Sequence, residues 1–195
     1  MAEQDGAADA VLDEPAPRRS GTGRAVALAR LLHQECGHLL QLYRERESFL
    51  DDHTPEGGRI VSLSPDTLGD DPGVEEQVGL LHAALRQCLG LLHCLTLREV
   101  EEEMGELEGE YEAMRKNVRS RLEHLLLSTR VLLPQPGEAE VTPDNPCTEE
   151  VDGEMGSFAL KMWTYRVLLE ILHWADHASL TLHVIHTQSQ ETEEV

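Results

Sequence analysis

The chain has 195 residues, enough for one domain with a sizeable core, and its formal net charge at pH 7 is -21. Nucleic acid and anionic membrane surfaces attract clustered Lys and Arg, so a chain this acidic is expected to bind neither. Aromatic residues make up only 4 % of the sequence, so leucine must supply most of the core. A leucine-rich core favours helices over strands, and we therefore expect an all-α protein.

The prolines and the composition around them divide the chain. Residues 1–19 are acidic and contain neither a basic start nor an apolar stretch, so we expect a disordered tail without a signal peptide. Every later proline falls within residues 51–72 or 134–156, which are also rich in Gly, Asp and Thr. Because proline breaks helix interiors, these two segments are predicted to be loops. No run of about 18 apolar residues occurs, so no membrane-spanning helix is expected.

The segments without proline carry apolar residues at intervals of three and four, which is the period of an amphipathic helix. The middle segment is too long for one helix in a compact domain. It holds two apolar stripes, and we place a turn between them in the glutamate-rich stretch at 98–103. One domain over residues 20–188 is therefore predicted, with helices at 20–50, 74–97, 104–133 and 157–188 and a flexible tail at 189–195.

The lengths of the connections constrain the topology. A short turn makes the second and third helices antiparallel neighbours. A loop of about 22 residues can extend over roughly 70 Å, which exceeds the length of about 42 Å of a helix of about 28 residues. Both long loops can therefore cross the bundle, and we expect a long-chain four-helix bundle with up-up-down-down topology and two crossover loops. The alternative, an up-down-up-down bundle, leaves the two long loops without a purpose.

The cysteines say little about the compartment. The chain contains four of them, at positions 36, 88, 94 and 147, and none forms a CxxC pair, which argues against a structural zinc site or a thioredoxin-like motif. Disulfides are an open alternative, but a chain of this size does not need them for stability, so free thiols are favoured.

The last predicted helix contains a more specific pattern. It begins with Phe158, Lys161 and Trp163 in the spacing Phe-x-x-Lys-x-Trp, followed by Val167, Leu168, Glu170 and Trp174. The pattern resembles the fourth helix of the ciliary neurotrophic factor group of interleukin-6-type helical cytokines. In the first helix, Arg30 and Tyr43, thirteen residues apart, add to the likeness. The resemblance covers about half of the chain and is mostly periodicity in the two middle helices.

The resemblance implies a cytokine that assembles cell-surface receptors and triggers JAK/STAT signalling, with neurotrophic or growth-factor activity. It assigns Phe158 and Lys161 to a leukaemia inhibitory factor receptor-type chain and Arg30 to a ciliary neurotrophic factor alpha-type receptor. A glycoprotein 130-type chain would bind the first and third helices, at residues that the resemblance does not assign. Members of the group can leave cells without a signal peptide, so we expect an extracellular protein with a cytoplasmic pool.

The residues themselves support part of this assignment. Phe158 and Lys161 are three positions apart, so they share one face near the start of the helix, and Phe158 lies off the apolar stripe. A cation there is disfavoured by the helix dipole, which suggests that Lys161 serves binding instead of folding. Two plainer readings remain: Phe158 could cover the end of the core, and Arg30 could lie on a solvated helix face.

Enzyme chemistry fits less well. Glu35 with His38 and Glu170 with His173 form two Glu-x-x-His pairs, as in di-iron bundles, but the second helix has no acidic residue over 78–97 to complete such a site. We therefore predict a protein that is not an enzyme, with no catalytic residue, metal or cofactor. The main alternative to a cytokine is an intracellular helical-bundle adaptor, which the missing signal peptide favours.

Overall fold

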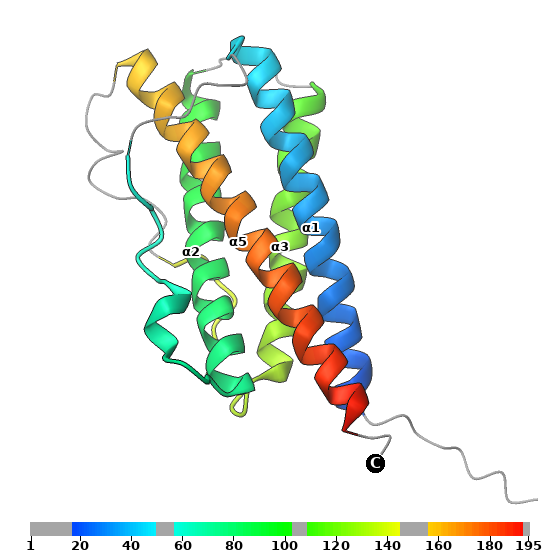
Figure 1. Ribbon diagram of the computed structural model, residues 1–195. Coiled ribbons are helices and arrows are strands. Elements are labelled where there is room, and N and C mark those ends of the chain that lie inside the picture. The colour runs from blue at the N-terminus through cyan, green and yellow to red at the C-terminus, as the bar shows by residue number, and fades with distance from the viewer. Residues whose placement is uncertain (1–16, 50–56, 103–108, 145–155, 193–195) are drawn as a thin grey trace, which may run out of the picture.

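The computed structural model describes residues 17–49, 57–102, 109–144 and 156–192, and these residues form helices and loops without a strand (Figure 1). Four long α-helices and one short 3-10 helix are present in the described ranges. They are α1 (Pro17–Glu47), η1 (Pro65–Leu68), α2 (Val74–Glu102), α3 (Glu110–Leu132) and α5 (Ser157–Glu191). The prediction of an all-α protein with four long helices is confirmed for this part of the chain.

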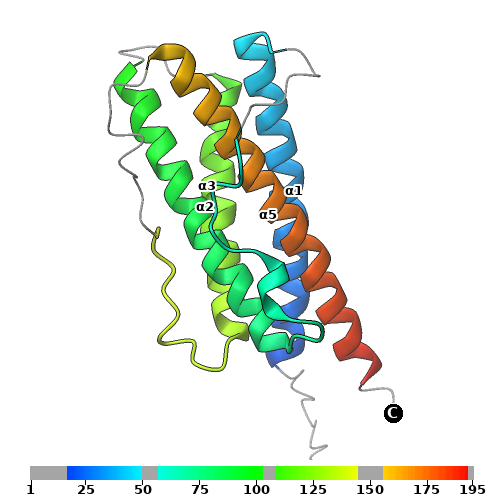
Figure 2. The ribbon, with the colours of Figure 1, turned by 60° about the vertical axis from the view of Figure 1, so that its left-hand side comes forward.

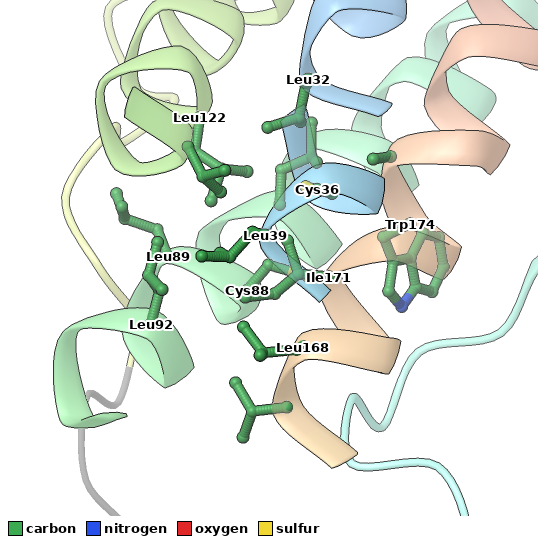
Figure 3. Close-up of a cluster of buried hydrophobic side chains, with 14 of the residues drawn as sticks. Leu32, Cys36, Leu39, Cys88, Leu89, Leu92, Leu122, Leu168, Ile171 and Trp174 are labelled. Atoms are coloured by element: carbon green, nitrogen blue, oxygen red, sulfur yellow. The ribbon is translucent and has the colours of Figure 1, made fainter. Parts of the chain in front are cut away.

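The four long helices form a bundle in which α1 and α2 each pack against both α3 and α5 (Figures 1 and 2). Leucine is the commonest residue in the described interior, although it does not make up most of it as the sequence predicted. Figure 3 shows Leu39 between Leu122 on one side and Trp174 on the other, with Leu32 above it. Burying each such side chain contributes about 1.5–3 kcal/mol, so the helices are held mainly by this shared core.

The ends of α1 differ from the prediction of 20–50. The helix begins at Pro17, within the predicted tail of residues 1–19, and proline is favoured in the first helical turn. It ends at Glu47 because Ser48 adopts a left-handed conformation, with φ of 55°. The backbone N–H of Phe49 then donates to the Arg44 carbonyl at 3.0 Å, which closes the helix in a Schellman-type cap. Residues 1–16 and 50–56 lie outside the described residues.

The boundary between the second and third helices also differs. The turn predicted at 98–103 is wrong for residues 98–102, because α2 continues as a helix to Glu102. Glu99 faces inward, where Tyr111 and Arg115 of α3 bind its carboxylate, so this polar stretch gains from staying helical. The helix predicted at 104–133 is described only from Glu110 to Leu132, and 103–108 lie outside the described residues. Helix α5 starts at Ser157, as predicted, and runs to Glu191 instead of 188.

Helix α2 contains a long apolar stretch. Its segment Val74–Glu99 is long and apolar enough to cross a membrane by length and composition alone, with 61 % of its most apolar window buried. The core helix of a bundle passes the same test, and α2 packs against α3 and α5.

The cysteines do not all remain free. Cys36 and Cys88 are free and buried in the core, where burial raises the pKa of each thiol. Cys94 is disulfide-bonded, so the expectation of free thiols is wrong for this residue. Cys147 lies outside the described residues.

Two loop segments are bound along the bundle. The first carries Arg59 and Ile60, which meet the buried carboxylate of Glu170: an Arg59 nitrogen lies 3.3 Å from one of its oxygens, and the Ile60 N–H donates to the other at 3.5 Å. Trp174 Nε1 also donates to Glu170, at 3.2 Å. Glu170 therefore ties the first loop to α5.

The second segment lies beside α2. The ring of His82 donates through Nε2 to the Glu140 carbonyl at 2.6 Å, and its Nδ1 lies 2.8 Å from Thr129 Oγ1 on α3. One turn along α2, Arg86 Nε donates to the Thr142 carbonyl at 3.0 Å. These contacts bind residues 140–142 to α2, and His82 links them to Thr129 of α3.

Candidate functional site

Phe158 lies near the start of α5 and is 70 % exposed. It therefore does not cover the end of the core. The other phenylalanine, Phe49, packs against Tyr43 and Tyr165 instead. Burial of a phenylalanine normally stabilises a protein, so an exposed one on a helix gains nothing for folding and is available to a partner.

Lys161 stands one turn further along the same face of α5. Its side chain is 47 % exposed, and its ammonium nitrogen lies 2.7 Å from Oε2 of Glu47, the last residue of α1. The Tyr43 hydroxyl donates to the backbone carbonyl of Lys161 at 2.9 Å. Both the main chain and the side chain of Lys161 are therefore bound to the end of α1.

Aromatic side chains strengthen the same junction. The ring of Tyr165 stacks against Tyr43 at 6.4 Å between centroids and packs against Phe49 at 5.3 Å. The Tyr165 hydroxyl accepts a hydrogen bond of 2.8 Å from Arg44 Nε. Aromatic pairs and such hydrogen bonds each add about 1 kcal/mol of stability. The junction therefore holds the first turns of α5, which carry Phe158, against the end of α1.

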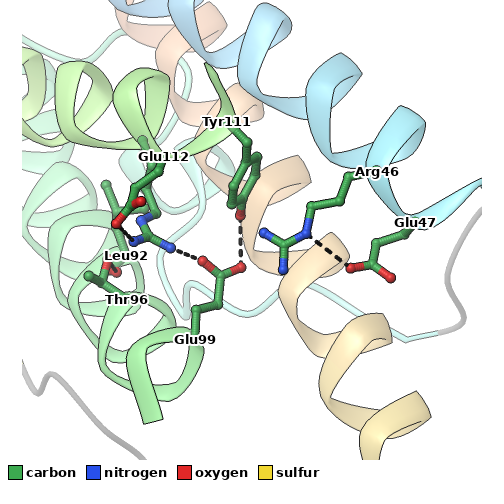
Figure 4. Close-up of polar contacts among 8 residues, drawn as sticks. Arg46, Glu47, Leu92, Thr96, Glu99, Tyr111 and Glu112 are labelled. Carbon is green, nitrogen blue, oxygen red and sulfur yellow. Dashed lines mark hydrogen bonds and ion pairs between the residues drawn. The ribbon is translucent and has the colours of Figure 1, made fainter. Parts of the chain in front are cut away.

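A buried ion cluster lies beside this junction, between the end of α2 and the start of α3 (Figure 4). Arg115 binds Glu99 and, at 3.4 Å, Glu112, while the Tyr111 hydroxyl donates to Glu99 at 2.9 Å. Burial lowers the pKa of Arg115, and the nearby Arg46 lowers it further. Arg46 also lies 4.9 Å from the centre of the Tyr111 ring, so the cluster reaches α1.

Arg30 occupies a different part of the molecule. It lies 17 residues before Glu47 on α1, which corresponds to about 26 Å along the helix axis. Its guanidinium donates to Nδ1 of His183 on α5 at 3.0 Å, and both side chains are exposed. Leu180 and Val184, which flank His183 on α5, are exposed as well. The structure therefore brings Phe158 and Lys161 together and leaves Arg30 on a separate α1–α5 surface.

Sequence reasoning expected a third surface on the first and third helices but assigned no residues to it. The neighbouring helices α1 and α3 leave Leu31, Leu127 and Val131 exposed. Leu31 and Leu127 lie off the apolar stripes of their helices, and this was the signal that could have identified them. Exposed apolar residues on two adjacent helices are typical of protein-binding surfaces.

The residues considered for metal chemistry have other partners. Arg121 donates to both oxygens of Glu35, at 3.1 and 2.9 Å, and Glu170 binds Arg59 and Trp174. His173 lies with its ring edge-on to Trp174, and burial lowers its pKa. Within the described ranges, no group of three or more His, Cys, Asp or Glu could hold a metal ion.

Comparison of the chain with protein-family models, with curated proteins and with solved structures finds no match.

Proposed function

We propose that this protein is a helical cytokine of the ciliary neurotrophic factor type, which assembles cell-surface receptors and performs no catalysis. The observation that carries the proposal is the exposed Phe158 beside Lys161, on a helix start that Tyr43 and Glu47 of α1 hold in place. An exposed aromatic side chain next to an ordered cation has the composition of a binding hot spot, in which a few residues supply most of the affinity. Its partner would be a leukaemia inhibitory factor receptor-type chain.

The topology that we propose is up-up-down-down with two crossover loops. Two observations support it. Helix α1 packs against α3 and α5 and has no comparable interface with α2, so the first two helices of the chain are not neighbours in the bundle. In Figure 1, the blue start of α1 and the blue-green start of α2 lie at the lower end, and α3 and α5 start at the upper end. An alternating bundle would place α1 beside α2.

Two further surfaces fit two further receptor chains. We assign the surface with Arg30, His183 and the exposed Leu180 and Val184 to a ciliary neurotrophic factor alpha-type receptor. The surface with Leu31, Leu127 and Val131 on α1 and α3 is assigned to a glycoprotein 130-type chain. Three separate surfaces would let one small protein bring two signalling receptors together, and their cytoplasmic kinases would then activate each other.

The disulfide at Cys94 supports an extracellular site of action. Disulfides persist in oxidising compartments and are rare in the cytosol, where thiols are kept reduced. This observation weighs against the intracellular adaptor, which we keep as the alternative outcome of the test below.

The test uses soluble receptor ectodomains and the double variant Phe158→Ala with Lys161→Ala. The unmodified chain should bind a leukaemia inhibitory factor receptor-type ectodomain and trigger phosphorylation in cells that bear the receptors. We expect the double variant to lose at least about a hundredfold in affinity, because both hot-spot residues are removed. Leu97→Ala removes an exposed apolar side chain from α2 and serves as the matched control.

Circular dichroism should show the same helix content in all three proteins, because Phe158 and Lys161 are exposed. Undiminished binding by the double variant would contradict the assignment of these two residues. Failure of the unmodified chain to bind any of the three ectodomains would contradict the cytokine function and favour the adaptor.

A further inference from the structure

We propose that Glu47 is a positioning residue for this surface: its carboxylate fixes the Lys161 ammonium beside Phe158, so that the partner recognises the ammonium with neutral oxygen acceptors. The inference rests on the proposed function, because it concerns the same surface. It adds the chemistry of the partner, namely an apolar pocket for the phenyl ring bordered by carbonyl or hydroxyl oxygens.

The two side chains of the Glu47–Lys161 pair differ in their exposure to solvent. The Glu47 side chain is only 10 % exposed, whereas Lys161 is 47 % exposed, and their charged atoms are 2.7 Å apart. Arg46 approaches the other oxygen of Glu47 at 3.5 Å and also lies over the Tyr111 ring (Figure 4). The carboxylate is therefore the fixed member of the pair, and the ammonium is the member that solvent or a partner can reach.

Neither charge is placed to suit its own helix. Glu47 is the last residue of α1, where the helix dipole is negative, and Lys161 lies near the start of α5, where it is positive. Each charge is disfavoured by its own helix and compensated by the other. The pair therefore determines where the ammonium lies, and without Glu47 the long lysine side chain would sample many rotamers.

The pairing also restricts the partner. A lysine ammonium has three N–H donors, and Glu47 accepts from one of them, which leaves donors for a partner. Its positive charge is already balanced by Glu47, so a carboxylate on the partner would meet a second carboxylate within a few ångströms. Neutral acceptors complete the hydrogen bonds without that repulsion.

The test compares Glu47→Gln and Glu47→Asp with Glu45→Gln. Glu45 lies on the same last turn of α1 but accepts a hydrogen bond from Gln41, at 3.1 Å, and serves as the matched control. Affinity of each full-length chain for the leukaemia inhibitory factor receptor-type ectodomain is measured at about 0.1 M and about 1 M salt, where the Debye length falls from about 10 Å to about 3 Å.

The ion pair itself is checked without any receptor. A zero-length carbodiimide cross-link should join Lys161 to Glu47 and be identified by mass spectrometry of the joined peptides. The sequence contains only one other lysine, Lys116, which has no reason to couple to this carboxylate.

We expect Glu47→Gln to weaken binding about tenfold, Glu47→Asp to restore part of the loss, and Glu45→Gln to change little. The affinity of the unmodified chain should change less than about threefold over the salt range, because neutral acceptors respond weakly to screening. Equal affinities of Glu47→Gln and Glu45→Gln, or a steep loss of unmodified-chain affinity with salt, would overturn the inference.

The two failures can be told apart. If the cross-link forms and the unmodified chain binds no receptor ectodomain, the proposed function fails although the ion pair exists. If the chain binds the ectodomain and no Lys161–Glu47 cross-link forms, the positioning role fails although the proposed function stands.

Discussion

Two regions of the bundle hold their neighbouring segments by different chemistry. Where α1 meets α5, the charged contact is made by the Glu47 carboxylate and the Lys161 ammonium, without a histidine. Beside α2, residues 140–142 are held by His82, whose pKa burial lowers, and by Arg86, which also pairs with Glu140 at 2.7 Å. Mildly acidic conditions should therefore weaken the attachment of residues 140–142 to α2. The α1–α5 junction beside Phe158 should keep its geometry under the same conditions.

The two regions also differ in their connection to the core. At the α1–α5 junction, the rings of Tyr43 and Tyr165 are fully buried and part of the core itself. The loop beside α2 is held by its Glu140 and Thr142 carbonyls, by the ion pair of Glu140 with Arg86 and by the partly buried Val141. The junction should therefore unfold only with the bundle, whereas the loop can detach locally.

The largest expected effect breaks the buried cluster behind the candidate site. Arg115→Met leaves the carboxylates of Glu99 and Glu112 buried without their cation, and we expect a loss of about 3–5 kcal/mol in the free energy of unfolding. Chemical denaturation measures it. Arg119→Met removes an exposed pair with Glu123 and should cost well under about 1 kcal/mol. Similar small losses in both variants would show that the cluster does not stabilise this end.

The second-largest expected effect comes from removing the disulfide of Cys94 on α2. Cys94→Ser removes the disulfide, and we expect a loss of about 2–4 kcal/mol in unfolding free energy. Cys88→Ala, which leaves the disulfide intact, is the control. Alkylation of the unfolded, unreduced chain should modify Cys36 and Cys88 and leave Cys94 unmodified. Modification of Cys94 under these conditions would contradict the disulfide.

A smaller effect sharpens the description of the junction. Tyr43→Phe keeps the buried ring and removes only the hydroxyl that donates to the Lys161 carbonyl. We expect a loss of about 1 kcal/mol in unfolding free energy, together with a weaker affinity for the receptor ectodomain, because the start of α5 is held less firmly. Surface plasmon resonance at a temperature where both proteins are fully folded separates the two quantities. An unchanged affinity would mean that this hydrogen bond does not position the site.

The smallest effect is a dependence on pH. Burial lowers the pKa of His82, and the positive charges of Arg86 and Arg130 add to this, although the bond to the Glu140 carbonyl opposes it. Burial also lowers the pKa of His173 and of His177. Because these pKa values are lower in the folded than in the unfolded chain, the unfolded chain binds more protons as the pH falls through about 6.5, and stability decreases.

Denaturation midpoints at about pH 7.5 and pH 5.5 measure this decrease. His82→Gln can still donate to Glu140 and should show a smaller decrease, which the other two histidines maintain. A stability that rises on acidification would contradict the lowered pKa values of these histidines.

The helices themselves could be predicted from the sequence because proline and apolar spacing act locally. Phe158 could be predicted as exposed for the same reason, since it lies off the stripe that Leu160 and Trp163 begin. The ends of the helices depended on contacts that spacing does not encode. Helix α1 ends at a left-handed Ser48, where a glycine would be the expected signal. Helix α2 extends through its glutamates because Arg115 on α3 binds Glu99.

The site was only partly visible in the sequence. Phe158 and Lys161 were assigned from the resemblance of the last helix, and their spacing of three positions on one helix supported that assignment. The contact that holds Lys161 in place could not be predicted, because Tyr43 and Lys161 are 118 positions apart in the chain. Glu47 carried no signal at all, since a glutamate at the end of a helix is ordinarily taken for a solvated residue.

The most direct measurement is hydrogen–deuterium exchange of the full-length chain with and without a leukaemia inhibitory factor receptor-type ectodomain. Binding should slow exchange in the first turns of α5, around Phe158 and Lys161, and at the end of α1 around Glu47, and leave the middle of α2 unchanged. Protection confined to other helices, or none along the start of α5 at saturating receptor, would contradict the account.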